Sequence, residues 1–166
     1  MQPKNWKSFT RRIPVRAEMV EVYSAWTTSQ GLESWFLRKA DFRDQDIALS
    51  DLTPVQKDNT YTWFWYGYSD ASKEEGTILE ANGQSQLSFG FGAAGTVDVL
   101  LESLPDGQTL VSITQHEIPE DDTSRMNYYV GCTVGWTFYL ANLKSVLEGG
   151  LDLRNRDENI KDVVSS

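Results

Sequence analysis

The stretch that decides the fold is residues 125–150, which read RMNYYVGCTVGWTFYLANLKSVLEGG. Its large apolar residues recur every three or four positions, the period of one face of an α-helix; they are Tyr129, Cys132, Trp136, Leu140, Leu143 and Leu147. The polar residues 121–124 suit a helix N-terminus, and Gly149-Gly150 suits a C-terminal end. The pattern predicts a helix of roughly 25 residues and about 38 Å, long enough to cross a whole sheet.

Before this helix the apolar period changes to two, which is typical of half-buried strands. Asn82-Gly83 and Pro105-Asp106-Gly107 are turn sequences between such runs. Because the runs are consecutive and closely spaced, they predict an antiparallel meander. The expected strands are residues 60–66, 75–81, 85–91, 96–101 and 108–118.

The N-terminal part predicts one strand and two short helices. Residues 6–13 favour a strand that ends before Pro14, since proline cannot donate to a ladder. Apolar positions after Arg16 predict a helix to about Thr27, and Ser29 is the expected cap of a second helix over residues 30–36. Between residues 37 and 58, only short strands near 40–43 and 47–49 are expected.

This element order predicts an α+β fold in which a curved antiparallel sheet wraps around the long C-terminal helix. The helix is the only element large enough to cover one apolar face of the sheet. We expect residues 1–154 to form a single domain, and residues 155–166 to be a charged tail that frays.

Composition excludes several classes of function. With one cysteine and one histidine, the chain has too few ligands for a cysteine cluster or a histidine-rich metal site, so no metal is expected. The net charge of −9 repels nucleic acid and anionic lipid. The sequence has no secretion signal or run of 18 apolar residues, which favours a cytoplasmic protein without membrane spans.

Three local features invite a catalytic or cofactor interpretation and have simpler ones. Residues 90–95 read GFGAAG, the letters of a dinucleotide-binding motif, but a strand and not a helix is expected to follow, so no cofactor is predicted. Cys132 lies on the apolar stripe, which favours a small core residue over a reactive thiol. His116 is expected on the outer face of its strand, without a nucleophile beside it.

Several short motifs resemble a known family. Residues 22–26, VYSAW, and 31–36, GLESWF, look like the opening of the START-like helix-grip superfamily (SRPBCC). Gly135-Trp136, Tyr139-Leu140 and Asn142-Leu143 resemble the final-helix motif of its activator of heat-shock-protein ATPase group. The resemblance runs from about Trp6 to Arg154 and implies a six- or seven-stranded sheet that grips the last helix, with a cavity between them.

The resemblance leaves the function open, because a fold does not determine an activity. Members bind sterols, lipids, polyketides or plant hormones, some are cyclases, and some stimulate a chaperone ATPase. One departure concerns acid–base chemistry: a histidine is common near the end of the last strand in this group, whereas Gln115 holds that place here and His116 points the other way.

Aromatic side chains that point inward are the expected site. They either fill the core or line an open pocket, and alternation alone does not distinguish the two. The residues expected to surround a small apolar or aromatic ligand are Trp35, Trp63, Trp65, Phe89, Phe91, Val99, Ile113, Gln115, Tyr129, Cys132, Thr133 and Trp136.

The first interpretation is therefore a binding module without catalytic residues. A protein-interaction or chaperone-regulating domain is the alternative, since the acidic surface would steer a basic partner. A polyketide cyclase-like enzyme comes last, with Gln115, Glu117 and Tyr129 as its only helpers. The sequence does not decide between a monomer and a homodimer.

Overall fold

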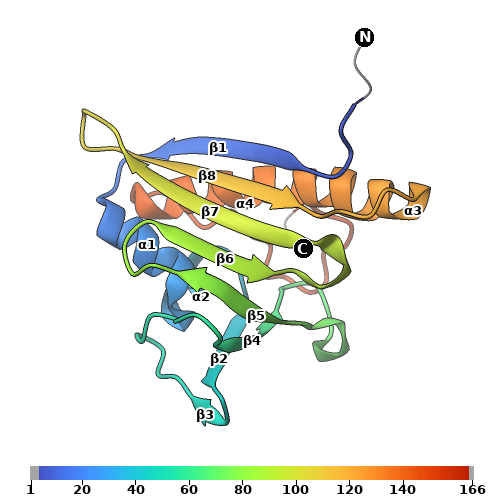
Figure 1. The fold of residues 1–166 in the computed structure, drawn as a ribbon, viewed down its shortest axis with the longest axis horizontal. Helices are drawn as coiled ribbons and strands as arrows, with labels where there is room; N and C mark the ends of the chain where they lie inside the picture. The colour runs from blue at the N-terminus through green and yellow to red at the C-terminus, as the bar shows by residue number, and fades with distance from the viewer. Residues whose placement is uncertain (1–3, 165–166) are drawn as a thin grey trace.

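The computed structural model describes residues 4–164 as one curved antiparallel sheet with a long helix behind it (Figure 1). The predicted α+β helix-grip architecture is confirmed. In chain order the elements are β1 (Phe9–Val15), α1 (Met19–Thr27), α2 (Ser29–Trp35), β2 (Lys39–Asp44), β3 (Ile47–Ala48), β4 (Thr60–Phe64), η1 (Asp70–Ser72), β5 (Glu74–Ala81), β6 (Gln86–Gly90), η2 (Gly92–Ala94), β7 (Thr96–Ser103), β8 (Thr109–His116), α3 (Asp122–Ser124), η3 (Arg125–Val130) and α4 (Gly131–Leu147).

The sheet has eight strands in the order β1-β8-β7-β6-β5-β4-β2-β3. The resemblance implied six or seven strands, and the two-residue β3 at one edge extends that number. Alternate residues of β7 and β8 face the helix, and Val97, Val99, Val111 and Ile113 are at most 3% exposed. The period-two pattern therefore identified the inner face of the sheet correctly.

β1 differs from the prediction because it continues through Pro14. Pro14 lies opposite Leu110 of β8, and the strand ends only at Val15. The Pro14 carbonyl accepts a hydrogen bond from Lys144 Nζ at 2.8 Å, so it points away from β8. Since β1 is an edge strand, a proline at an outward-facing position removes no ladder hydrogen bond.

The junction of α1 and α2 is tighter than predicted. Thr28, not Ser29, caps α2, because its Oγ1 accepts from Gly31 N at 2.9 Å while Ser29 already lies in the helix. Gly31 permits this close approach. A Cβ placed on it would lie 2.2 Å from the Ser24 carbonyl oxygen of α1, so the two helices could not pack this closely around any larger residue.

The predicted long helix is continuous from Asp122 to Leu147 but is not uniform. Asp121 caps it by accepting from Ser124 N at 2.9 Å, and Arg125–Val130 adopt a π-helical conformation before the α-helix resumes at Gly131. π-helical turns are rare and are frequent at functional sites. Among residues 4–164, no helix is both long and apolar enough to cross a membrane.

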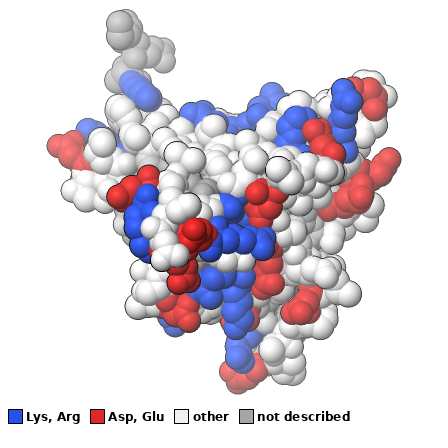
Figure 2. Space-filling model, turned by 180° about the vertical axis from the view of Figure 1, so that it is seen from behind, with Lys and Arg blue, Asp and Glu red and all other residues white. Residues whose placement is uncertain are grey.

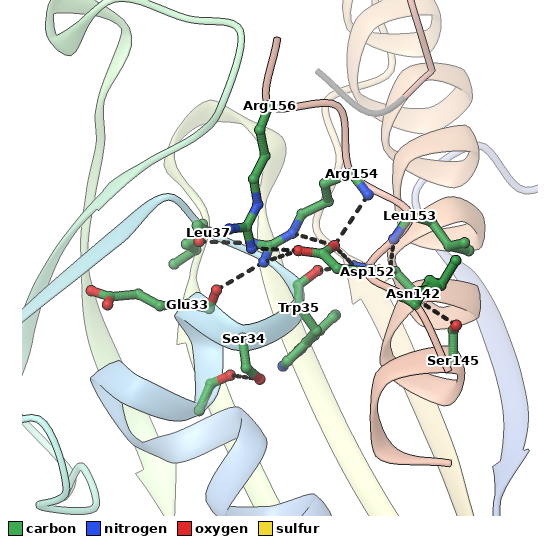
Figure 3. A network of polar contacts seen from close by, with 12 residues as sticks. Glu33, Ser34, Trp35, Leu37, Asn142, Ser145, Asp152, Leu153, Arg154 and Arg156 are labelled. Atoms are coloured by element: carbon green, nitrogen blue, oxygen red, sulfur yellow. Dashed lines mark hydrogen bonds and ion pairs between the residues drawn. The ribbon is translucent and has the colours of Figure 1, made fainter. Parts of the chain in front are cut away.

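A segment that we call the C-terminal strap, residues 150–156, returns from α4 to α2 (Figure 3). Arg154 donates to the carbonyls of Leu37 and Glu33 at 2.8 and 2.9 Å, and Asp152 accepts from Arg154 and from Asn142 of α4. A cation beside the last carbonyls of a helix satisfies groups that would otherwise lack partners. The strap therefore links α4 to the C-terminal end of α2.

Candidate functional site

Side chains fill most of the space between the sheet and the long helix. Aromatic rings pack within it: the centroids of Trp63 and Phe89 on the sheet are 5.0 Å apart, and Phe91, just after β6, lies 5.9 Å from Trp136 of α4. Seven of the twelve residues expected around a ligand are no more than 3% exposed: Trp35, Trp63, Phe89, Val99, Ile113, Gln115 and Trp136. For most of these residues the structure therefore shows core packing.

A pocket of about 360 Å³ opens beside this core, against η3 and α4. Its volume is within the range of small-molecule sites, roughly 300–1,000 Å³. Trp65, Phe91, Cys132 and Trp136 are the predicted site residues that the structure brings together here. The complete lining is Phe36, Trp65, Tyr68, Ser72, Phe91, Asn127, Gly131, Cys132, Gly135, Trp136 and Tyr139.

Two glycines lie on the side of the pocket that is formed by α4. Gly131 and Gly135 lie one turn apart in α4, and a Cβ added to Gly135 would meet no atom within 4 Å. A glycine inside a helix costs about 1 kcal/mol relative to alanine. The helix therefore gives up stability at a position where a larger side chain would occupy the pocket.

Gln115 is a structural link rather than a free polar contact. Its Nε2 donates to the Ala94 carbonyl and its Oε1 accepts from Trp136 Nε1, each at 2.9 Å. It thereby ties the connection between β6 and β7 to α4 and fixes the orientation of the Trp136 ring, one wall of the pocket.

Two weakly acidic side chains of the pocket lining, Cys132 and Tyr139, have raised pKa values. Burial is the main cause that raises the pKa of the Cys132 thiol, the charge of Glu74 adds to it, and a hydrogen bond with Gln115 opposes it. Burial likewise raises the pKa of Tyr139 to about 12. Both groups act there as neutral, weakly polar walls.

Tyr129 and Thr133, the other two predicted site residues, lie outside the pocket lining. Tyr129 packs its ring against Trp6 and Phe9, with centroids 5.0 and 5.4 Å away. Thr133 has a buried hydroxyl without a hydrogen-bond partner among the described residues. The π-helical turn lies just before Thr133, and it directs Tyr129 toward the N-terminal segment.

The three helpers of the enzyme interpretation do not surround one space. Gln115 is committed to Ala94 and Trp136, Tyr129 faces Trp6, and Glu117 accepts from Thr96 Oγ1 at 2.7 Å in a left-handed backbone conformation. His116 lies on the outer face, as alternation predicts, with its Nε2 2.8 Å from Asp98 Oδ2. In the described part of the chain, no group of three His, Cys, Asp or Glu residues is placed to hold a metal ion.

The glycine-rich segment 90–95 forms a turn into β7. Gly92 and Gly95 take positive φ angles of 51° and 98°, which glycine adopts without strain. The segment contains only the three-residue η2 and continues into β7, so the α-helix that the dinucleotide motif requires does not follow these glycines.

Seven residues of the pocket lining were not among the predicted ligand-binding residues. Glycines spaced four apart inside an apolar helix, Gly131 and Gly135, were a usable signal of missing side-chain volume. Tyr68 and Ser72 lie in the connection between β4 and β5, which includes the short η1 and whose path no periodicity encodes. The seven are Phe36, Tyr68, Ser72, Asn127, Gly131, Gly135 and Tyr139.

Residues 16–148 match the family model described as Activator of Hsp90 ATPase homolog 1-like protein. The chain belongs to this family. The family resemblance seen in the motifs of the first and last helices is thus confirmed. A search of curated proteins gives no significant match.

Solved structures similar to this family member share its fold at low sequence identity. A protein from Staphylococcus saprophyticus has a TM-score of 0.69 and 18% identity, covering 89% of this chain and 96% of its own. The Aha1 dimer from Colwellia psychrerythraea has a TM-score of 0.65 and 19% identity, covering 86% and 97%. An HSP90 activator from Plasmodium falciparum has a TM-score of 0.60 and 18% identity, covering 86% and 96%.

Proposed function

We propose that this protein binds a small apolar or aromatic molecule in the pocket beside α4, and does so in the cytoplasm. The observation that carries the proposal is the pocket itself, about 360 Å³ with six aromatic side chains in its lining and two glycines on its helical wall. Pockets for small molecules are mostly apolar and aromatic, with few polar groups. Here the polar groups are Ser72, Asn127 and Cys132.

The open volume at Gly135 supports the same proposal. Since a close-packed interior has few voids larger than a water molecule, a space of this size beside a buried core is suited to an occupant. Glycine at this position stabilises the helix less than alanine would, so its contribution is to the shape of the pocket.

The test is to fill the pocket from the helix. Thermal-shift and native mass spectrometry against a library of lipids and aromatic molecules should identify a ligand of the wild-type protein. Gly135→Leu should abolish its binding, whereas Ala141→Leu, a similar enlargement at an exposed position of α4, should not. A ligand that binds Gly135→Leu as well as wild type would place the site elsewhere.

A second candidate function is regulation of a chaperone or interaction with another protein. It is favoured by the family itself and by a structural neighbour described as an HSP90 activator. The net charge of −9 would steer a basic partner surface, although one face mixes acidic and basic side chains between wide uncharged areas (Figure 2).

The ATPase rate of an Hsp90-type chaperone tests this alternative. If the protein is an activator, adding it raises the rate, and the effect weakens as salt screens the charges. An unchanged rate across a range of protein and salt concentrations would exclude chaperone activation. Mass measurement during the same experiment would decide between a monomer and a homodimer.

A further inference from the structure

The electrostatic character of the pocket restricts the class of ligand more narrowly than the shape of the pocket does. An inference about that class depends on the proposed binding function. No Lys, Arg or His of the described chain is in the lining. Aromatic faces carry partial negative charge and attract cations within about 6 Å, tryptophan most strongly. Trp65 and Trp136 both contribute to the walls. The pocket is therefore electrostatically suited to a positive charge.

A carboxylate lies beside this aromatic wall. Glu74, the first residue of β5, is half-buried, and a Cβ added to Gly92 would come within 2.3 Å of its Oε1. Gly92 directly follows Phe91, which lines the pocket. The charge of Glu74 also acts on the Cys132 thiol in the pocket lining and adds to the burial that raises its pKa.

The Glu74 carboxylate has no partner in the described part of the chain. Its neighbour Glu75 pairs with Lys73 at 2.9 Å, whereas within residues 4–164 no hydrogen bond or ion pair reaches the Glu74 side chain. Burial first, and the charge of Glu75 second, raise the pKa of Glu74. A half-buried carboxylate without a partner is costly, and a bound cation would remove that cost.

Basic side chains around the pocket have partners of their own. Arg38 donates to the Trp65 carbonyl and pairs with Asp70, and Arg154 is held by Asp152 in the strap. A neutral ligand would leave Glu74 unpaired, and an anionic ligand such as a fatty acid would be repelled by it. The net charge of −9 would attract a cation to the molecule as a whole.

We propose that the pocket selects an organic cation, an ammonium group on an apolar or aromatic body, held by the faces of the aromatic rings and by Glu74. The rings stabilise the charge through cation–π attraction, and they bury the apolar part of the same molecule.

A pair of probes of equal shape separates charge from burial. Phenyltrimethylammonium and tert-butylbenzene differ in charge but scarcely in size, and titration of tryptophan fluorescence or calorimetry measures both. The cation should bind about tenfold more tightly, as expected for a partly desolvated cation–π site. Glu74→Gln should weaken cation binding and leave the neutral probe unaffected, whereas Glu80→Gln, an exposed carboxyl farther along the same strand, should change neither.

Each other outcome has a defined meaning. Equal affinity for the two probes would overturn the selection of cations and leave the proposed binding function standing. A preference for the cation that persists in Glu74→Gln would overturn the role of Glu74. If neither probe binds at millimolar concentration, the inference is overturned and the proposed function loses its main support. Circular dichroism of each variant confirms that the fold is retained.

Discussion

At the scale of single residues, the absence of a side chain has different consequences at two glycines. Gly31 lets α1 and α2 approach closely, whereas Gly135 faces open space. We expect Gly31→Ala to lower the free energy of unfolding by about 1–3 kcal/mol through overpacking against backbone. Gly135→Ala should raise it by up to about 1 kcal/mol through helix propensity. Urea denaturation of the two variants measures both changes.

The two variants serve as controls for one another, because both add one methyl group to a glycine and yet should change the free energy of unfolding in opposite directions. If Gly135→Ala were as destabilising as Gly31→Ala, the space beside α4 would not be open. A neutral effect of Gly31→Ala would mean that the two helices are not packed as described.

Gln115 permits a second prediction at this scale. Gln115→Leu leaves the Trp136 indole N–H and the Ala94 carbonyl without their buried partner. An unsatisfied buried group costs about 1–3 kcal/mol, so the variant should unfold at a clearly lower urea concentration. Gln86→Leu, an exposed glutamine of β6, is the matched control and should change stability little. Equal effects of the two substitutions would remove the structural role of Gln115.

At the scale of elements, the C-terminal strap makes stability depend on pH. Partial burial alone would raise the pKa of Asp152, but hydrogen bonds from Arg154, Asn142 and Arg156 outweigh it and hold that pKa far below the ordinary value of 3.8 (Figure 3). A carboxyl with a lowered folded-state pKa stabilises the fold above its unfolded-state pKa. This stability is lost as the pH falls below about 4.

Asp152→Asn should therefore be less stable than wild type at pH 7, and the difference should shrink as the pH is lowered from 4. Denaturation midpoints measured from pH 2 to pH 7 test this. Identical pH profiles for the two proteins would show that the strap carboxyl does not contribute to folding.

The elements also show what periodicity encodes and what it does not. The helix of 122–147 and the inner faces of β7 and β8 could be predicted, because burial of one face imposes a regular spacing. The continuation of β1 through Pro14 could not, since it depends on the strand lying at an edge. The π-helical turn has no period of its own, and periodicity therefore does not show that Tyr129 and Thr133 lie outside the pocket lining.

At the scale of the whole molecule, the tryptophans report on how the interior is filled. Trp26, Trp35, Trp63 and Trp136 are at most 3% exposed, whereas Trp6 and Trp65 are partly exposed. We expect acrylamide to quench only the part of the fluorescence that comes from Trp6 and Trp65. A ligand in the pocket should protect Trp65 and leave Trp6 accessible.

Trp65→Phe identifies the part of the fluorescence quenching that comes from the pocket. In this variant a ligand should have little effect on acrylamide quenching, because the tryptophan that it protects is absent. Quenching of all six tryptophans to a similar extent would contradict a filled interior and require a wide opening between the sheet and α4.

The position of the pocket in the whole molecule also explains why its lining could be predicted only in part. Alternation places Trp63 and Phe89 toward the helix, the helical stripe places Trp136 toward the sheet, and all three side chains are buried. Whether rings that face each other leave a gap depends on their volumes and on loops such as residues 65–73. The open space lies at the margin of the core, where Phe36, Tyr68 and Tyr139 come together.

The pairing of β1 with β8 has a consequence for how the chain is made. Thr10 and Thr114 bond across two strands separated by 104 positions in the sequence. On the ribosome, the first strand emerges long before its neighbour has been translated. Until then β1 has no strand to pair with. Arg11, Arg12 and Pro14 disfavour its pairing with strands of other nascent chains. Addition of β1 to this sheet therefore comes only after β8 has been synthesised.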